Sequence, residues 1–127
     1  MLITAAVFAV IAASVHLYIF ILESLRWTEP ATMAVFRVST PQEAASTQAL
    51  AYNQGFYNLF LAVGVLLGVV LLTAGSRVAG LTLMSFASAS MVLAALVLAA
   101  SNRSMIRPAL MQGAPPAVCL AFTLLGA

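Results

Sequence analysis

The sequence has no lysine and no aspartate, and it has one histidine and one cysteine in 127 residues. A single cysteine, Cys119, excludes an intramolecular disulfide and dithiol chemistry. The absence of aspartate excludes Asp-based catalytic triads, and a single histidine excludes a multi-histidine metal centre within one subunit, so we predict no metal site. The motifs HExxH and GxSxG and a phosphate-binding loop are also missing.

What the chain has instead is apolar sequence. Hydrophobic residues make up 64% of it, charged residues 6%, and the mean hydropathy is +1.12. These values lie outside the range of soluble domains and predict an integral membrane protein whose main partner is the lipid bilayer. The net charge of +2 comes from five arginines against three glutamates. We attribute this excess to loop orientation and predict no nucleic-acid partner.

Four apolar runs are long enough to cross a bilayer as helices, at about 1.5 Å per residue against a hydrocarbon thickness of about 30 Å. They predict an all-α membrane protein with one domain over residues 1–127, in which four transmembrane helices form a compact bundle. The expected helices cover residues 1–24, 54–74, 78–101 and 108–127. The last one contains Gly113, Pro115 and Pro116, which we expect to kink it or delay its start.

The first connection, residues 24–53, is the one long polar segment. Thr40 and Pro41, followed by Glu43, resemble a helix start and predict a short interfacial helix from Pro41 to Leu50. The apolar residues Met33, Val35 and Phe36 fit either insertion into the membrane interface or a lid over the bundle.

Arginine placement predicts the orientation. Arg26 and Arg37 lie in the first connection, Arg103 and Arg107 in the third, and Arg77 alone in the second. The positive-inside rule therefore places the first and third connections in the cytoplasm and both termini outside, in what we expect to be a bacterial plasma membrane.

His16 and Glu23 lie seven residues apart on one face of the first helix, about 10 Å apart along its axis. Ionisable groups at membrane depth are costly unless they have partners, so this pair predicts a buried polar site. Trp27 follows at the headgroup level, where an indole is well suited.

A second polar group begins the helix expected at residues 54–74. Asn53 can cap that helix, and Gln54, Tyr57 and Asn58 follow within two turns. These residues and Glu23 lie at the same membrane surface, which predicts a cavity with Glu23 at its mouth and His16 at its floor. Gln112 is a further candidate. The alternative is that these side chains only hold the helices together through hydrogen bonds.

The order of these residues resembles a known family. His16-Leu17-Tyr18 with Glu23 and Trp27, then Asn53-Gln54-Gly55-Phe56-Tyr57-Asn58, then Gln112-Gly113 before a proline, is similar to the bacterial and fungal family of small membrane proteins known as domain of unknown function 1304. The resemblance covers essentially the whole chain. It implies a four-helix membrane protein and supplies no mechanism.

The sequence leaves three functions open. In the first, a pocket binds or transforms a small hydrophobic molecule, with Glu23 as acid or base, His16 as its counterpart, Tyr57 as a third catalytic candidate, and Asn53, Gln54, Asn58, Trp27 and Gln112 as binding candidates. In the second, an oligomeric transporter uses His16 and Glu23 as a proton or cation path. The third is an accessory subunit of a membrane complex.

Two further expectations concern partners and cofactors. Small residues at Gly64, Gly68, Gly80, Ser85 and Ser88 suit close helix packing, either within the chain or in a homo-oligomer. No cofactor is predicted, although a haem with His16 as its single protein ligand is compatible with the sequence.

Overall fold

The computed structural model describes all residues, 1–127, and consists of helices joined by short connections. The four long helices are α1 (Leu2–Phe20), α3 (Pro41–Thr73), α4 (Arg77–Ser101) and α5 (Ile106–Gly126). Between them lie a π-helical segment η1 (Ile21–Leu25), a short helix α2 (Pro30–Phe36) and a 3₁₀ turn η2 (Arg103–Met105). Four stretches, Leu2–Leu25, Pro41–Thr73, Arg77–Ser101 and Arg103–Gly126, are long and apolar enough to cross a membrane. The predicted all-α fold with four membrane-spanning helices is confirmed.

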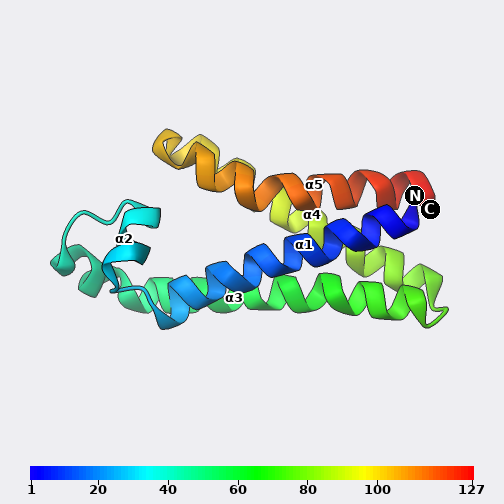
Figure 1. Cartoon of the computed structure of the whole chain (residues 1–127), viewed down its shortest axis with the longest axis horizontal. Coiled ribbons are helices and arrows are strands. Elements are labelled where there is room, and N and C mark those ends of the chain that lie inside the picture. The colour runs from blue at the N-terminus through cyan, green and yellow to red at the C-terminus, as the bar shows by residue number, and fades with distance from the viewer.

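The long helices pack side by side with alternating direction (Figure 1). α1 packs against α3 and α5, and α4 packs against the same two helices from the opposite side. Both termini lie together at one end, next to the turn between α3 and α4 (Figure 1). We call this the terminal end. The opposite end carries α2, and we call it the arginine end, because Arg26 and Arg37 lie in its first connection, Arg103 in η2 and Arg107 in the first turn of α5.

α3 begins at Pro41 as the sequence predicts, but it does not stop at Leu50. The Thr40 hydroxyl accepts a hydrogen bond from the Glu43 backbone N–H at 3.1 Å, and the Glu43 carboxyl accepts one from the Ser39 N–H at 2.9 Å. The helix then continues without interruption to Thr73. The expectation of a separate interfacial helix, and of a second long helix that begins only at residue 54, was therefore wrong, because nothing between Leu50 and Gln54 ends a helix.

The length of α3 indicates that its first turns extend beyond the bilayer core. Its 33 residues correspond to about 50 Å, whereas the hydrocarbon layer is about 30 Å thick. The apolar part lies toward Thr73, so the polar first turns after Pro41 extend past the bilayer core. The short connection helix of this protein is instead α2, which begins at Pro30 and ends at Phe36, and Arg37 follows it in the left-handed conformation with φ 57°.

α5 does not start late, so the expectation that Gly113, Pro115 and Pro116 delay its start was wrong. It runs continuously from Ile106 to Gly126 with Pro115 and Pro116 inside it. Neither proline has an N–H to donate, so the carbonyls of Met111 and Gln112 lose their helical partners. Membrane helices tolerate this where neighbouring groups surround the freed carbonyls, and Pro116 is buried.

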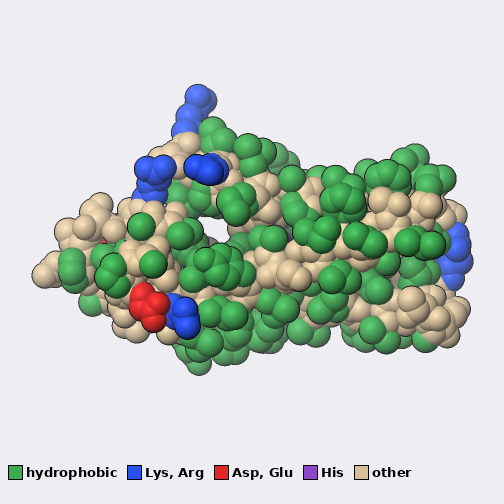
Figure 2. Space-filling view, in the orientation of Figure 1, with side chains coloured by type: hydrophobic (Ala, Val, Ile, Leu, Met, Phe, Trp, Pro, Cys, Tyr) green, Lys and Arg blue, Asp and Glu red, His purple; other side chains and the backbone are tan.

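Small side chains form the core, and large apolar ones point outward. Most of the buried apolar residues are alanines, drawn from all four long helices, and Val65, Met84 and Met91 lie among them, whereas Ile3, Val63, Val78 and Phe86 are exposed. This distribution suits a chain surrounded by lipid, where close helix packing depends on small residues. Figure 2 shows the resulting apolar surface along the length of the helices.

Gly68 and Gly80 bring α3 and α4 into contact near the terminal end. A Cβ atom at Gly80 would lie 2.6 Å from the Leu72 backbone nitrogen and 2.8 Å from the Gly68 carbonyl oxygen. At Gly64, one turn toward the arginine end, the nearest atom would be the Ala87 Cβ at 3.8 Å. The packing at Gly68 therefore lies within one chain, and space opens between α3 and α4 toward the arginine end.

Candidate functional site

Glu23 lies in the π-helical segment that continues α1. A π-helix has one more residue per hydrogen-bonded turn than an α-helix and occurs mostly as short insertions, often at functional sites. Here the segment Ile21–Leu25 leaves Leu22 and Glu23 buried while Ile21 and Leu25 are exposed. Glu23 is 8% exposed, so its side chain lies inside the protein and not at the lipid surface.

Asn58 on α3 is the hydrogen-bond donor for this carboxyl group. Its Nδ2 lies 3.1 Å from Glu23 Oε2 and 3.2 Å from the Gln54 backbone oxygen. One amide group therefore connects the Glu23 carboxyl to the backbone of α3 one turn away. A buried polar group is costly without a partner, and this bond offsets part of that cost while the second carboxyl oxygen makes no hydrogen bond within the chain.

Gly55 allows α3 to approach η1 closely enough for this bond. A Cβ atom at Gly55 would lie 2.0 Å from the Ser24 hydroxyl oxygen and 3.0 Å from its backbone nitrogen. The same hydroxyl donates a hydrogen bond to the Tyr52 carbonyl at 2.8 Å. Gly55 and Ser24 thus fix the distance between the two helices beside Glu23.

Trp27 fastens the first connection to α3. Its indole N–H lies 3.1 Å from both the Ala44 carbonyl oxygen and the Thr47 hydroxyl oxygen. Its ring also packs against Phe36 of α2, with 5.2 Å between the ring centres. Trp27 therefore holds α2 over the arginine end of the long helices.

A cavity of about 470 Å³ lies next to Glu23 in the space between the helices. Its volume falls within the range of small-molecule sites, about 300–1,000 Å³. We call it the polar cavity, and it is lined by Glu23, Trp27, Phe36, Gln54, Tyr57, Asn58, Leu61, Ala94, Leu98, Asn102, Met105 and Gln112. Figure 2 shows an opening through the molecule at the arginine end, where this cavity lies.

A smaller hollow of about 90 Å³ lies between α1 and α5 beside the polar cavity. Nine of its eleven lining residues are hydrophobic, among them Val15, Ile19 and Met111. Phe36, Leu98, Met105 and Gln112 line both spaces. The polar cavity and the apolar side hollow therefore share one wall, to which α2 contributes Phe36.

Comparison with known proteins identifies the family. Residues 10–124 match the family described as "Protein of unknown function (DUF1304)". The chain is a member of the DUF1304 family. The match includes every residue that lines the polar cavity of this DUF1304 protein. Searches of the curated proteins and of the solved structures find no match.

Most of the candidate residues meet in the DUF1304 protein's polar cavity. Glu23, Trp27, Gln54, Tyr57, Asn58 and Gln112 all line it. Asn53 lies inside α3, so it does not cap a helix, and it borders a shallow surface hollow on the other side of that helix with Tyr52 and Gln48.

His16 does not line the polar cavity. It is buried, 2% exposed, and its Nδ1 lies 2.9 Å from the Ala12 carbonyl oxygen of the same helix. Because a carbonyl only accepts, Nδ1 carries the proton and donates it. The structure thus places Glu23 on the cavity wall and His16 deeper, among the buried alanines of α1. The DUF1304 protein also has no group of three His, Cys, Asp or Glu side chains that could hold a metal ion.

Asn102 was the polar lining residue that sequence reasoning missed. It follows α4 directly, and its Oδ1 accepts hydrogen bonds from the Ser104 N–H at 3.1 Å and the Ser104 hydroxyl at 2.6 Å. The order of the helices could have indicated it, because the end of α4 must lie at the same end of the molecule as Gln54. Phe36, which lines both spaces of the DUF1304 protein, could be predicted only with knowledge of how α2 folds back.

Proposed function

We propose that the chain binds a small amphipathic molecule in the polar cavity, with Glu23 as the group that recognises it. The observation that carries this proposal is a buried carboxyl group with one hydrogen-bond donor, Asn58, on the wall of a cavity of about 470 Å³. A carboxyl oxygen without a partner inside the protein is available to a hydroxyl, amine or amide hydrogen of a ligand.

The two adjoining spaces favour an amphipathic ligand over a wholly polar one. Gln54, Tyr57 and Gln112 supply hydrogen-bonding groups around Glu23. The side hollow between α1 and α5 supplies apolar walls continuous with that chamber. A molecule with a polar head and a short hydrophobic body fits this arrangement, because each part meets surface of its own kind.

The same geometry supports acid–base chemistry on the bound molecule. Glu23 is the acid or base in this mechanism, and Tyr57 and the amide of Gln112 orient a ligand oxygen beside it. The arrangement supports a proton path through His16 and Glu23 less well, because His16 donates to its own helix and does not line the cavity.

For the location of the protein, we propose a bacterial plasma membrane with the arginine end in the cytoplasm. Four of the five arginines lie at that end, whereas Arg77 lies at the terminal end, where its guanidinium donates to the Gly126 carbonyl at 2.7 Å. The positive-inside rule favours this orientation. The polar cavity then lies near the cytoplasmic surface.

A carbodiimide experiment tests access to the site. Dicyclohexylcarbodiimide is an apolar reagent for carboxyl groups, and we expect it to modify Glu23 in native membranes, as located by peptide mass spectrometry. Ala94→Phe fills the polar cavity from α4 and is expected to slow the modification. Ala100→Phe adds the same side chain to an exposed position of α4 that lines no cavity wall named above, and should not change the rate. Equal rates in all three proteins would contradict an open cavity beside Glu23.

Compounds that copurify with the protein test binding itself. Mass spectrometry of extracts from the purified wild type, Glu23→Gln, Ala94→Phe and Ala100→Phe compares their small-molecule contents. We expect at least one amphipathic compound in the wild type and in Ala100→Phe that is lost from the other two. Identical extracts from all four proteins would overturn the proposed function.

A further inference from the structure

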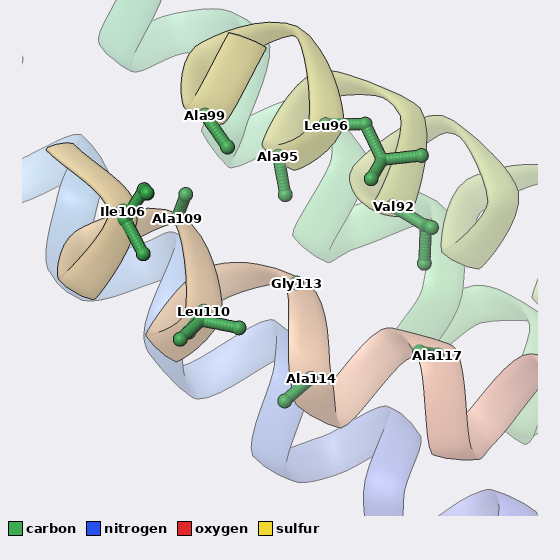
Figure 3. A pocket seen from close by; sticks show the side chains of 10 residues that line it. All are labelled: Val92, Ala95, Leu96, Ala99, Ile106, Ala109, Leu110, Gly113, Ala114 and Ala117. Carbon is green, nitrogen blue, oxygen red and sulfur yellow. The ribbon is translucent and has the colours of Figure 1, made fainter. Parts of the chain in front are cut away.

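A second concave surface lies on the outside of the molecule, between α4 and α5. It is a groove of about 360 Å³ near the arginine end (Figure 3). Its lining consists of Val92, Ala95, Leu96 and Ala99 from α4 and Ile106, Ala109, Leu110, Gly113, Ala114 and Ala117 from α5. Apart from Gly113, every lining residue is hydrophobic, so the groove offers no side chain that forms hydrogen bonds.

The groove is narrow because small residues let the two helices meet. A Cβ atom at Gly113 would lie 2.7 Å from the Ala95 Cβ. Ala95 and Ala109 are buried, whereas Leu96, Ile106 and Leu110 are exposed and stand beside them as walls. From Ile106 to Ala117 the helix rises about 16 Å. A space of this shape fits a single extended hydrocarbon chain better than it fits a helix, which is about 10 Å wide.

Two arginines lie beyond one end of the groove on the same side of α5. Arg107, Leu110, Ala114 and Ala117 follow one another at spacings of three and four residues, which places them on one face of α5, and Arg103 lies in the 3₁₀ turn η2 directly before that helix. Both arginines are exposed, and neither side chain makes a hydrogen bond within the chain. Both lie at the start of the stretch Arg103–Gly126, which is long and apolar enough to cross a membrane, and arginines at the ends of such stretches attract lipid phosphates.

We propose that this groove is a binding site for an anionic phospholipid. One acyl chain lies along the groove, and Arg103 and Arg107 hold the phosphate and the anionic headgroup. Charge complementarity is the reason for choosing a lipid as the occupant. A second copy of the chain fits less well, because a two-fold axis along the membrane normal would bring the same two arginines of both copies together.

Native mass spectrometry with two lipids of equal chains tests this assignment. The purified protein is incubated with dioleoyl phosphatidylglycerol or dioleoyl phosphatidylcholine, and retained lipid is measured. We expect the wild type to retain phosphatidylglycerol more strongly. R103Q/R107Q should bind phosphatidylglycerol more weakly, by about fivefold for each arginine removed, and should lose less affinity for phosphatidylcholine, because its choline cation offsets the phosphate charge. Ala114→Leu fills the groove and should weaken the retention of both lipids.

Two control variants separate the site from general charge and size effects. Arg26→Gln removes an arginine from the same end but from outside the groove, and Ala100→Leu enlarges an exposed alanine of α4 that does not line it. Both should retain phosphatidylglycerol as the wild type does. Equal retention of the two lipids by the wild type would overturn the proposal. A dimer that becomes monomeric in Ala114→Leu would also overturn it, since a second copy would then be the occupant.

Discussion

The Asn58 side chain on α3 donates a hydrogen bond of 3.1 Å to the Glu23 carboxyl at the end of the first span. The two residues are 35 positions apart, and their contact joins the two helices whose packing shapes the polar cavity. A hydrogen bond in surroundings of low polarity is strong when it is made and costly when one partner is removed. Asn58 is therefore the positioning residue for the carboxyl group.

Asn58→Leu should destabilise the protein. The substitution leaves the Glu23 carboxyl without a donor, which costs about 1–3 kcal/mol, whereas interhelical hydrogen bonds in membranes contribute about 0.6 kcal/mol on average. We expect the free energy of unfolding, measured by SDS titration in micelles, to fall by about 1 kcal/mol. Glu23→Leu/Asn58→Leu should recover most of this loss. Asn53→Leu, on the outer side of α3, serves as the control and should change the free energy by less than about 0.5 kcal/mol.

Gly80→Ala should separate α3 from α4. Its Cβ would lie 2.6 Å from a backbone nitrogen, at Leu72, and backbone atoms cannot turn aside. Overpacking of this kind costs about 1–3 kcal/mol, which thermal unfolding in micelles can measure. Gly64→Ala is the matched control, because its new methyl group would meet only the Ala87 Cβ at 3.8 Å. If Gly80→Ala and Gly64→Ala were destabilised equally, the close contact of α3 and α4 at Gly80 would not explain the loss of stability.

Hydropathy was sufficient to predict the number of long helices, because a run of about 20 apolar residues is typical of a membrane-spanning helix. It could not predict where α3 begins. The Thr40 cap was readable, but polar residues after it were interpreted as a membrane boundary, although helix formation does not depend on bilayer depth. The prolines of α5 led to the wrong expectation of a late helix start. Packing against α1 and α4 keeps the helix intact around Pro115 and Pro116.

Part of the polar cavity was predictable, because the chain connection between α1 and α3 determines which of their ends lie together. The connection between the first two spans had to place Glu23 near Gln54 and Asn58, and the structure places them together. The position of His16 was not predictable, because a shared helix face does not determine which residues border a cavity. The π-helical segment at Glu23 has no sequence signature of its own, and it alters the direction of every side chain after Ile21.

Trp27→Phe should loosen α2 and the first turns of α3. The substitution keeps an aromatic ring against Phe36 but removes the N–H that bonds to the Ala44 carbonyl and the Thr47 hydroxyl. Loss of about 1 kcal/mol corresponds to amide hydrogen exchange about five times faster over residues 30–48. Thr47→Val removes one of the two acceptors and should give a smaller increase. Unchanged exchange in Trp27→Phe would mean that ring packing alone holds α2.

Cysteine labelling should show the arginine end in the cytoplasm. In a Cys119→Ala background, Ser39→Cys places a thiol in the exposed connection before α3, and Ser76→Cys places one in the exposed turn at the terminal end. The orientation follows from four arginines at one end and Arg77 at the other. A membrane-impermeant maleimide added to intact spheroplasts should therefore modify Ser76→Cys at once and Ser39→Cys only after permeabilisation. The reverse pattern would place the polar cavity at the outer surface, where its ligand would come from outside the cell.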